Sequence, residues 1–169
     1  MKDFVKDGQK LPLYGIGPRL VFTIASVTAT GIILFCYILK IGILESSLIL
    51  IFRIAGGVLI ALGIFIWFVG ALRSDMDENI SENRLKTDGI YAWVRNPMYS
   101  GWWMLITGIS LMWHNAWLPI TLFINWGIMT AVLKNTEEKW LKNLYGKEYE
   151  DYCKHVNRCV PWKHMDREI

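Results

Sequence analysis

Two long stretches of the chain are almost entirely apolar, and they constrain the fold more than any other feature of the sequence. The first runs from Arg19 to Leu39 and the second from about Ser47 to Leu72. A helix of about 20 apolar residues spans the ~30 Å hydrocarbon core of a bilayer. Both stretches therefore predict membrane-spanning helices. The first is expected to remain uncleaved, because it is too long for a signal peptide and no small-residue cleavage site follows it.

Two shorter apolar stretches follow, Met98 to Trp113 and Trp117 to Leu133, and only His114, Asn115 and Ala116 separate them. Such a short polar break predicts a tight helical hairpin. The first of these stretches has 16 residues and would reach only ~24 Å as a helix, so we expect it to begin within the membrane interface. His114 is expected to be an interfacial residue.

These stretches predict an all-α, polytopic membrane protein with a single integral-membrane domain over residues 1–169. The expected transmembrane helices are residues 19–39, 47–72, 98–113 and 117–133, and the polar segments are 73–97 and 134–169. Gly56, Gly63 and Gly70 recur every seven residues, which predicts a helix face for close packing. Arg53 lies near the start of its helix, where its side chain can reach the interface, so a structural role is expected.

The positive charges predict the orientation. Of the 18 Lys and Arg residues, 16 lie before the first stretch or at its start, in the 73–97 connection, or beyond residue 133. Because cytoplasmic loops are enriched in Lys and Arg, both termini and both polar segments are expected in the cytoplasm. The net charge of +3 gives no indication of nucleic-acid binding. The three cysteines lack metal-ligand spacing, so neither a metal site nor a disulfide framework is predicted.

The tail after the fourth stretch predicts two amphipathic helices. The first begins at Glu137 and Glu138 and ends at Tyr145-Gly146; the second carries Tyr149 and Tyr152 at helical spacing. Taken alone, these tyrosines are typical of packing residues, and the glutamate pair is typical of charges that compensate a helix dipole.

Two motifs in the polar segments change that interpretation. Residues 87–101 read TDGIYAWVRNPMYSG, and residues 137–141 read EEKWL, followed by Tyr145-Gly146, Tyr149, Tyr152 and Val156. Together they resemble the superfamily of isoprenylcysteine carboxyl methyltransferases and phospholipid methyltransferases, which are integral-membrane enzymes. The resemblance covers roughly residues 83–161.

The resemblance implies that S-adenosylmethionine binds in a cytoplasmic pocket between the 73–97 connection and the tail helices. It implies cofactor contacts from Asn83, Arg84, Leu85, Lys86, Tyr91, Asn96, Pro97, Met98, Tyr99 and Glu137. A carboxylate at Glu137 suits the ammonium or ribose of the cofactor, and the tyrosines suit its flat base. No catalytic residue and no metal ligand is assigned.

The chain departs from the superfamily pattern at three places. Asn96 stands where a histidine is usual before the proline, and Leu133 stands where a substrate-binding arginine is usual, with Lys134 the nearest positive charge. Phospholipid methyltransferases often carry a Gly-x-Gly motif that binds the cofactor. The one such triplet here, residues 15–17, precedes the first helix and so does not match the position of that motif. Lys134 is therefore the candidate substrate-binding residue.

The expected function is S-adenosylmethionine-dependent methyl transfer to a lipophilic or lipid-modified acceptor at the membrane, with a carboxylate favoured as the acceptor group. Three alternatives remain open at this point. They are a phospholipid amine N-methyltransferase, an NADPH-dependent membrane reductase of the sterol reductase type, and a non-catalytic membrane scaffold. The reductases commonly place an acidic residue after the motif glycine, whereas Trp102 follows Gly101 here.

Overall fold

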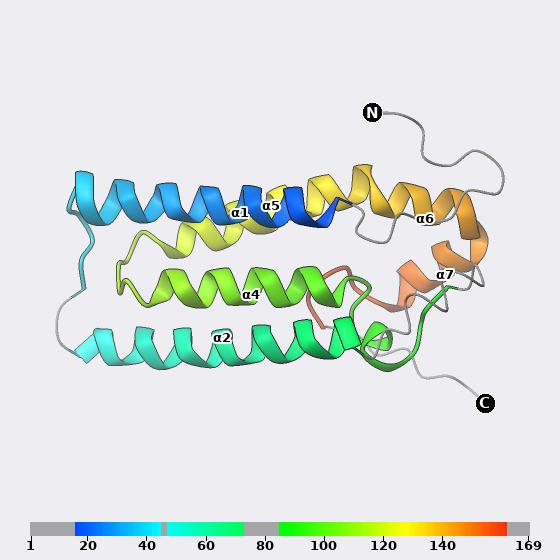
Figure 1. Cartoon of the computed structure of the whole chain (residues 1–169), viewed down its shortest axis with the longest axis horizontal. Coiled ribbons are helices and arrows are strands. Elements are labelled where there is room, and N and C mark those ends of the chain that lie inside the picture. The colour runs from blue at the N-terminus through cyan, green and yellow to red at the C-terminus, as the bar shows by residue number, and fades with distance from the viewer. Residues whose placement is uncertain (1–15, 45–46, 73–84, 162–169) are drawn as a thin grey trace.

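The computed structural model describes residues 16–44, 47–72 and 85–161, and this part of the chain is helical with no β-strand (Figure 1). Two isolated bridges, between Ile43 and Asn115 and between Val94 and Asn157, are the β-type pairings found within these residues. The all-α prediction is therefore confirmed.

The first two helices are the long apolar ones. Helix α1, Gly17–Ile32, continues into a π-helix, η1, Ile33–Ile38, and α2 runs from Ser47–Leu72. Among the described residues, Gly17–Ile38 and Leu48–Ala71 are the two helices long and apolar enough to cross a membrane. Their most apolar windows are only 17% and 11% buried within the protein. The apolar side chains thus face outward, as expected of helices whose solvent is lipid.

The third and fourth helices form the predicted hairpin, with different limits. Helix α4, Pro97–Leu111, and α5, Pro119–Asn135, are antiparallel neighbours (Figure 1). Each begins with a proline, which has no amide to leave unpaired in a first helical turn. The connection is longer than the three residues expected. Asn115 explains this, because its amide donates to the Ile41 carbonyl over 2.7 Å and its oxygen accepts from the Trp117 amide over 2.9 Å.

Helices α2 and α4 pack closely along the predicted glycine face. A Cβ atom added at Gly63 would lie 2.7 Å from the Gly101 carbonyl oxygen, and one added at Gly56 would lie 2.8 Å from the Gly108 carbonyl oxygen. At Gly70 the neighbours are Pro97 and Met98. Side chains at these positions would separate the two backbones, so the seven-residue spacing in both helices explains their contact.

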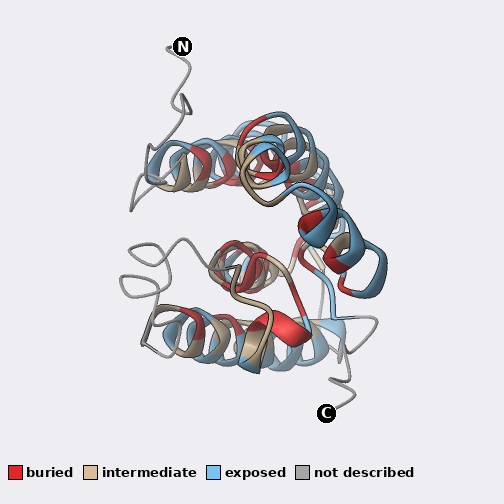
Figure 2. Ribbon diagram, turned by 90° about the vertical axis from the view of Figure 1, so that its right-hand side faces the viewer, coloured by how far each residue is buried: buried red, intermediate tan, exposed pale blue. Residues whose placement is uncertain are grey.

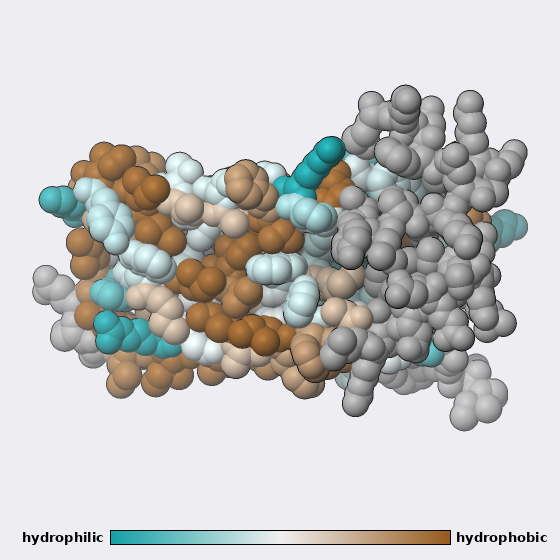
Figure 3. Space-filling view, in the orientation of Figure 1, coloured by the Kyte–Doolittle hydropathy of each residue, from teal (hydrophilic) through white to brown (hydrophobic). Residues whose placement is uncertain are grey.

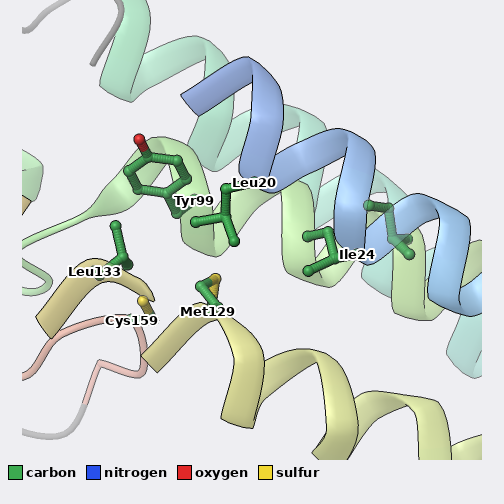
Figure 4. Packing of buried hydrophobic residues seen from close by; sticks show 7 residues of the cluster. Leu20, Ile24, Tyr99, Met129, Leu133 and Cys159 are labelled. Carbon is green, nitrogen blue, oxygen red and sulfur yellow. The ribbon is translucent and has the colours of Figure 1, made fainter. Parts of the chain in front are cut away.

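The core lies between α1, α4 and α5. Figure 2 shows buried residues concentrated on α4 and on the inward faces of its neighbours. Figure 4 shows Leu20 and Ile24 of α1 beside Tyr99 of α4 and Met129 and Leu133 of α5, with Cys159 from the tail joining them. In Figure 3 the visible helical part of the surface is a mixture of hydrophobic residues and residues of intermediate hydropathy, with few strongly hydrophilic ones. These three helices thus share a buried apolar cluster, while many other apolar side chains face outward.

The predicted tail helices are also present. Helix α6, Glu137–Tyr145, follows α5 almost directly, and α7, Lys147–His155, turns away from it at the far right of Figure 1. Gly146 separates the two with a φ of 54°, a conformation that glycine adopts without strain. A short 3-10 helix, η2, Gly89–Ala92, precedes α4. The starts of α1, α4 and α6 and the tail therefore meet at one end of the bundle, opposite the α4–α5 connection.

Candidate functional site

Contacts from three helix starts converge on Glu137. Glu137 is the first residue of α6, Tyr99 lies in the first turn of α4, and Ile16 directly precedes α1. The Tyr99 hydroxyl donates to Glu137 Oε1 over 2.5 Å, and the Ile16 amide donates to the same oxygen over 3.2 Å. Both partners are distant from Glu137 in the sequence, so the packing of the helices creates this site.

The Glu137 carboxylate is partly buried, and no cation is paired with it among the described residues. Burial raises its pKa above the usual value, and the hydrogen bonds from Tyr99 and Ile16 oppose that rise. None of the ion pairs among the described residues includes Glu137. Both hydrogen bonds end on Oε1. A partly buried carboxylate is stabilised by a positive charge or by further donors, so Oε2 is suited to a ligand's ammonium or hydroxyl groups.

Tyr91 adds a buried aromatic ring near the same carboxylate. Burial, and secondarily the charge of Glu137, raises the pKa of Tyr91 to about 12. Its hydroxyl is therefore neutral at physiological pH. The Tyr152 hydroxyl of α7 donates to the Tyr91 carbonyl over 2.5 Å, which fixes η2 against the tail. Of the predicted cofactor residues in the described part of the chain, Tyr99 bonds Glu137 directly, and Tyr91 lies close enough for the Glu137 charge to affect its pKa.

The adjacent carboxylate, Glu138, has a different environment. Arg158 binds it through both oxygens, with Nε 2.6 Å from Oε1 and Nη2 2.7 Å from Oε2. Arg95 Nη2 lies 3.3 Å from Oε1. Arg95 also donates to the Tyr149 hydroxyl over 3.4 Å and contacts the Cys153 sulfur. Glu138 is buried, and two guanidinium groups compensate its charge.

The residues at the start of α4 contact two different parts of the protein, the tail and α2. Asn96 is buried, and its side-chain amide donates to the Arg158 carbonyl over 3.4 Å. Pro97 and Met98 lie against Gly70 of α2. These side chains contact the tail and α2, whereas Tyr99 contacts Glu137.

The remaining predicted residues lie around this centre. Leu85 packs against Tyr149, Tyr152 and Val156, and Lys86 pairs with Asp88 over 3.0 Å. Lys134 is exposed in the last turn of α5. Asn83 and Arg84 lie outside the described residues. Within those residues no group of three or more His, Cys, Asp or Glu side chains is placed to hold a metal ion.

Sequence reasoning did not assign roles to Arg95 and Arg158. Arg95 stands inside the first motif, and Arg158 follows the second tail helix. The signal that could have found them is the glutamate pair itself. If the chain folds so that the carboxylates leave water, each needs a positive or hydrogen-bonding partner, and both arginines lie within the region of resemblance, residues 83–161.

Comparisons with known proteins indicate the family of the chain. Residues 37–148, more than half of the chain, match the family described as phospholipid methyltransferase. The chain is 33% identical over 94 residues to a protein-S-isoprenylcysteine O-methyltransferase of Dictyostelium discoideum, which covers 52% of this chain and 37% of that protein. No solved structure matches the chain significantly.

Two further relatives cover similar regions. A protein-S-isoprenylcysteine O-methyltransferase of Schizosaccharomyces pombe is 34% identical over 82 residues, 47% of this chain and 34% of that protein. A methanethiol S-methyltransferase of Crocosphaera subtropica is 31% identical over 81 residues, 47% of this chain and 30% of that protein. These matches span about a third of the length of each relative. On the extent of the family match, the chain belongs to the phospholipid methyltransferase family.

Proposed function

We propose that this protein transfers a methyl group from S-adenosylmethionine to a carboxylate of a lipophilic acceptor at the membrane. The observation that carries the proposal is the Glu137 carboxylate, which is bonded by Tyr99 and Ile16 and has no cationic partner among the described residues. Family membership supports the class of reaction. The names of the relatives from Dictyostelium and Schizosaccharomyces support a carboxylate acceptor.

The residues present fit a cofactor with an ammonium group, a ribose diol and a flat base. Glu137 would hold the ammonium or the ribose hydroxyls, and Tyr91 and Tyr99 would line the base or the sulfonium. The proposed further contacts are Asn83, Arg84, Leu85, Lys86, Asn96, Pro97 and Met98. When bound, S-adenosylmethionine supplies an electrophilic methyl group, which passes to an acceptor oxygen as the sulfur–carbon bond breaks.

A carboxylate acceptor matches the titratable groups at this end of the bundle. A carboxylate with a pKa of about 3.5 is already ionised at neutral pH and needs no general base. An amine with a pKa of about 10 must lose a proton first. Neither described histidine provides a buried base there, because His114 lies in the α4–α5 connection at the other end of the bundle and His155 is exposed at the end of α7. Lys134, exposed three residues before Glu137, is the proposed partner of the acceptor carboxylate.

We further propose that four helices cross the membrane, with both termini and the site in the cytoplasm. The positive charges support this orientation, since 16 of the 18 Lys and Arg residues lie on that side. Cofactor would then enter from the cytosol. The acceptor would arrive laterally from the bilayer, where the exposed apolar faces of α1 and α2 meet lipid.

Calorimetric titration with S-adenosylhomocysteine tests the cofactor assignment. The detergent-purified protein should bind it, and Glu137→Ala should weaken binding at least tenfold, the effect of about one charged hydrogen bond. Absence of binding by the unaltered protein, together with binding of NADPH, would replace the proposal with the reductase alternative. Unchanged affinity of Glu137→Ala for S-adenosylhomocysteine would mean that Glu137 does not contact the cofactor.

Incubation with a labelled methyl donor and a total membrane extract tests the acceptor. Label that base releases indicates an ester and supports a carboxylate acceptor. Base-stable label in lipid headgroups would favour a phospholipid amine, the second candidate that the family description supports. Cofactor binding without transfer to any component of the extract would favour a non-catalytic scaffold.

A further inference from the structure

We propose that Glu138 and Arg158 position the site, so that the two adjacent glutamates have separate roles: Glu137 faces the ligand, and Glu138 holds the tail in the place that the ligand requires. This inference rests on the proposed function. We call the Glu138–Arg158 ion pair, together with the backbone pairing of residues 157–158 with 95–96, the tail clasp. Glu138 and Arg158 are positioning residues and do not contact the reacting atoms.

The backbone half of the tail clasp is a short parallel pairing. The Arg95 amide donates to the Asn157 carbonyl over 2.9 Å, and the Asn96 amide donates to the Arg158 carbonyl over 3.0 Å. The side-chain amide of Asn96 reaches the same Arg158 carbonyl. Two bonds between short extended segments form a weak pairing by themselves. A further interaction is needed to hold it.

The ion pair supplies that interaction. Glu138 directly follows Glu137 on α6, and Arg158 donates hydrogen bonds to both carboxylate oxygens of Glu138. A bidentate arginine–carboxylate pair fixes orientation as well as distance. Cys159, the next residue, is buried in the core between α4 and α5. The tail clasp thus attaches residues 157–158 to α6 on one side and to the residues before α4 on the other.

The tail clasp connects to the ligand-facing carboxylate through α4. The Asn96 carbonyl accepts hydrogen bonds from the Ser100 amide over 3.0 Å and from the Ser100 hydroxyl over 2.9 Å, which begins α4. Tyr99 lies in that same turn and bonds Glu137. The contacts therefore form a closed ring that runs from Glu138 through Arg158, Asn96 and Tyr99 to Glu137. Because Glu137 and Glu138 are adjacent, loosening one side of the ring displaces the other.

Two readouts test the tail clasp in the full-length protein. The first is hydrogen exchange at the amides of Arg95 and Asn96, which depend on the tail carbonyls. The second is the affinity for S-adenosylhomocysteine. In Glu138→Gln and in Arg158→Gln, both amides should exchange faster and the affinity should fall about tenfold. The double variant should lose no more than Glu138→Gln alone, since Glu138→Gln already removes the ion pairs of that carboxylate with both Arg158 and Arg95.

Two further variants separate positioning from general disruption. Arg158→Lys keeps the charge without the bidentate geometry, and it should recover part of the affinity that Arg158→Gln loses. Glu150→Gln removes an exposed carboxylate of α7 that pairs with Lys142 over 2.7 Å. As the matched control, it should leave both readouts unchanged, because exposed pairs contribute little.

Three results would overturn the inference. Weaker binding by Glu138→Gln with unchanged exchange at the Arg95 and Asn96 amides would make Glu138 a direct ligand. Faster exchange with unchanged affinity would make the pairing independent of the site. Additive losses in the double variant would assign Glu138 and Arg158 separate tasks. If the unaltered protein binds no cofactor, the proposed function fails and the positioning role with it, whereas the exchange readout still reports whether the ion pair holds the tail.

Discussion

We expect ionisation of Glu137 to destabilise the ligand-free fold. Burial raises its pKa, so the folded state binds this proton more tightly than the unfolded chain does. Stability should therefore fall as the pH rises from the usual glutamate value through the raised one, and the penalty is fully present above both. Glu137→Gln keeps an oxygen for Tyr99 and Ile16 without the charge. We expect it to melt about 2–4 °C higher at pH 7, equivalent to about 1 kcal/mol, and to lose affinity for S-adenosylhomocysteine.

Thermal unfolding in detergent across pH 4 to 8 measures this effect. The melting temperature of Glu137→Gln should vary less over that range than that of the unaltered protein. Glu148→Gln, a change at an exposed position of α7, is the matched control and should behave like the unaltered protein. A lower melting temperature for Glu137→Gln at pH 7 would mean that the ionised carboxylate stabilises the fold.

Tyr99 is expected to keep Glu137 ionised. Its hydroxyl bond lowers the pKa of Glu137 against the effect of burial. Tyr99→Phe removes this bond and retains the ring, so the pKa of Glu137 should rise further. Binding of S-adenosylhomocysteine should then weaken about tenfold at neutral pH, and it should be lost at a higher pH than in the unaltered protein as the pH is lowered.

Calorimetry at several pH values checks this shift. Tyr37→Phe changes an exposed tyrosine in η1, at the other end of the bundle, and is the matched control. If Tyr99→Phe weakens binding by the same factor at every pH, the hydroxyl contacts the ligand and does not act through Glu137.

The close packing of helices α2 and α4 depends on the glycines where they touch. Gly63→Ala would place a methyl group 2.7 Å from the Gly101 carbonyl oxygen, so the helices would have to separate. We expect a loss of about 1–3 kcal/mol, seen as a lower melting temperature in detergent. Gly127→Ala in α5 is the matched control, because nothing lies within 4 Å of the added atom.

The control should be neutral or slightly stabilising, since alanine favours a helix over glycine by about 0.5–1 kcal/mol. Equal melting temperatures for the two alanine variants would mean that α2 and α4 adjust without strain. The glycine spacing would then not explain their close packing.

Elements whose causes are local could be predicted from the sequence. The limits of α2 follow from the length of its apolar stretch, and Gly146 separates the tail helices because glycine at that point adopts a positive φ. The α4–α5 connection could not be delimited in this way. Its length depends on the bond from Asn115 to Ile41, which joins positions 74 residues apart. No local pattern reports such a contact.

The candidate site likewise combines residues that the sequence could predict with an arrangement that depends on long-range packing. Tyr91, Tyr99 and Glu137 could be proposed because they stand in two motifs that resemble a known superfamily. Their convergence, and the division of the glutamate pair between a ligand-facing and an arginine-bound carboxylate, depends on how α1, α4, α6 and the tail pack. Arg158 was missed because its partner, Glu138, is 20 residues away and belongs to a different helix.

The α2–α4 contact also bears on how many times the chain crosses the membrane. Helix α4 touches α2 at Gly56, Gly63 and Gly70. Contacts from Gly56 to Gly70 cover about 21 Å of helix at 1.5 Å per residue. If α2 spans the bilayer, α4 therefore lies beside it through most of the hydrocarbon. We expect α4 and α5 to cross, although each has fewer residues than a typical spanning helix.

Reporter fusions test this topology. Green fluorescent protein, which fluoresces in the cytoplasm, and alkaline phosphatase, which is active on the other side, would be fused after residues 44, 85, 116 and 169. Phosphatase activity is expected after 44 and 116, and fluorescence after 85 and 169, because the positive charges lie at the latter side. Fluorescence after residue 116 would mean that α4 and α5 form a re-entrant hairpin. The α2–α4 contact would then have to hold at membrane depth without a crossing.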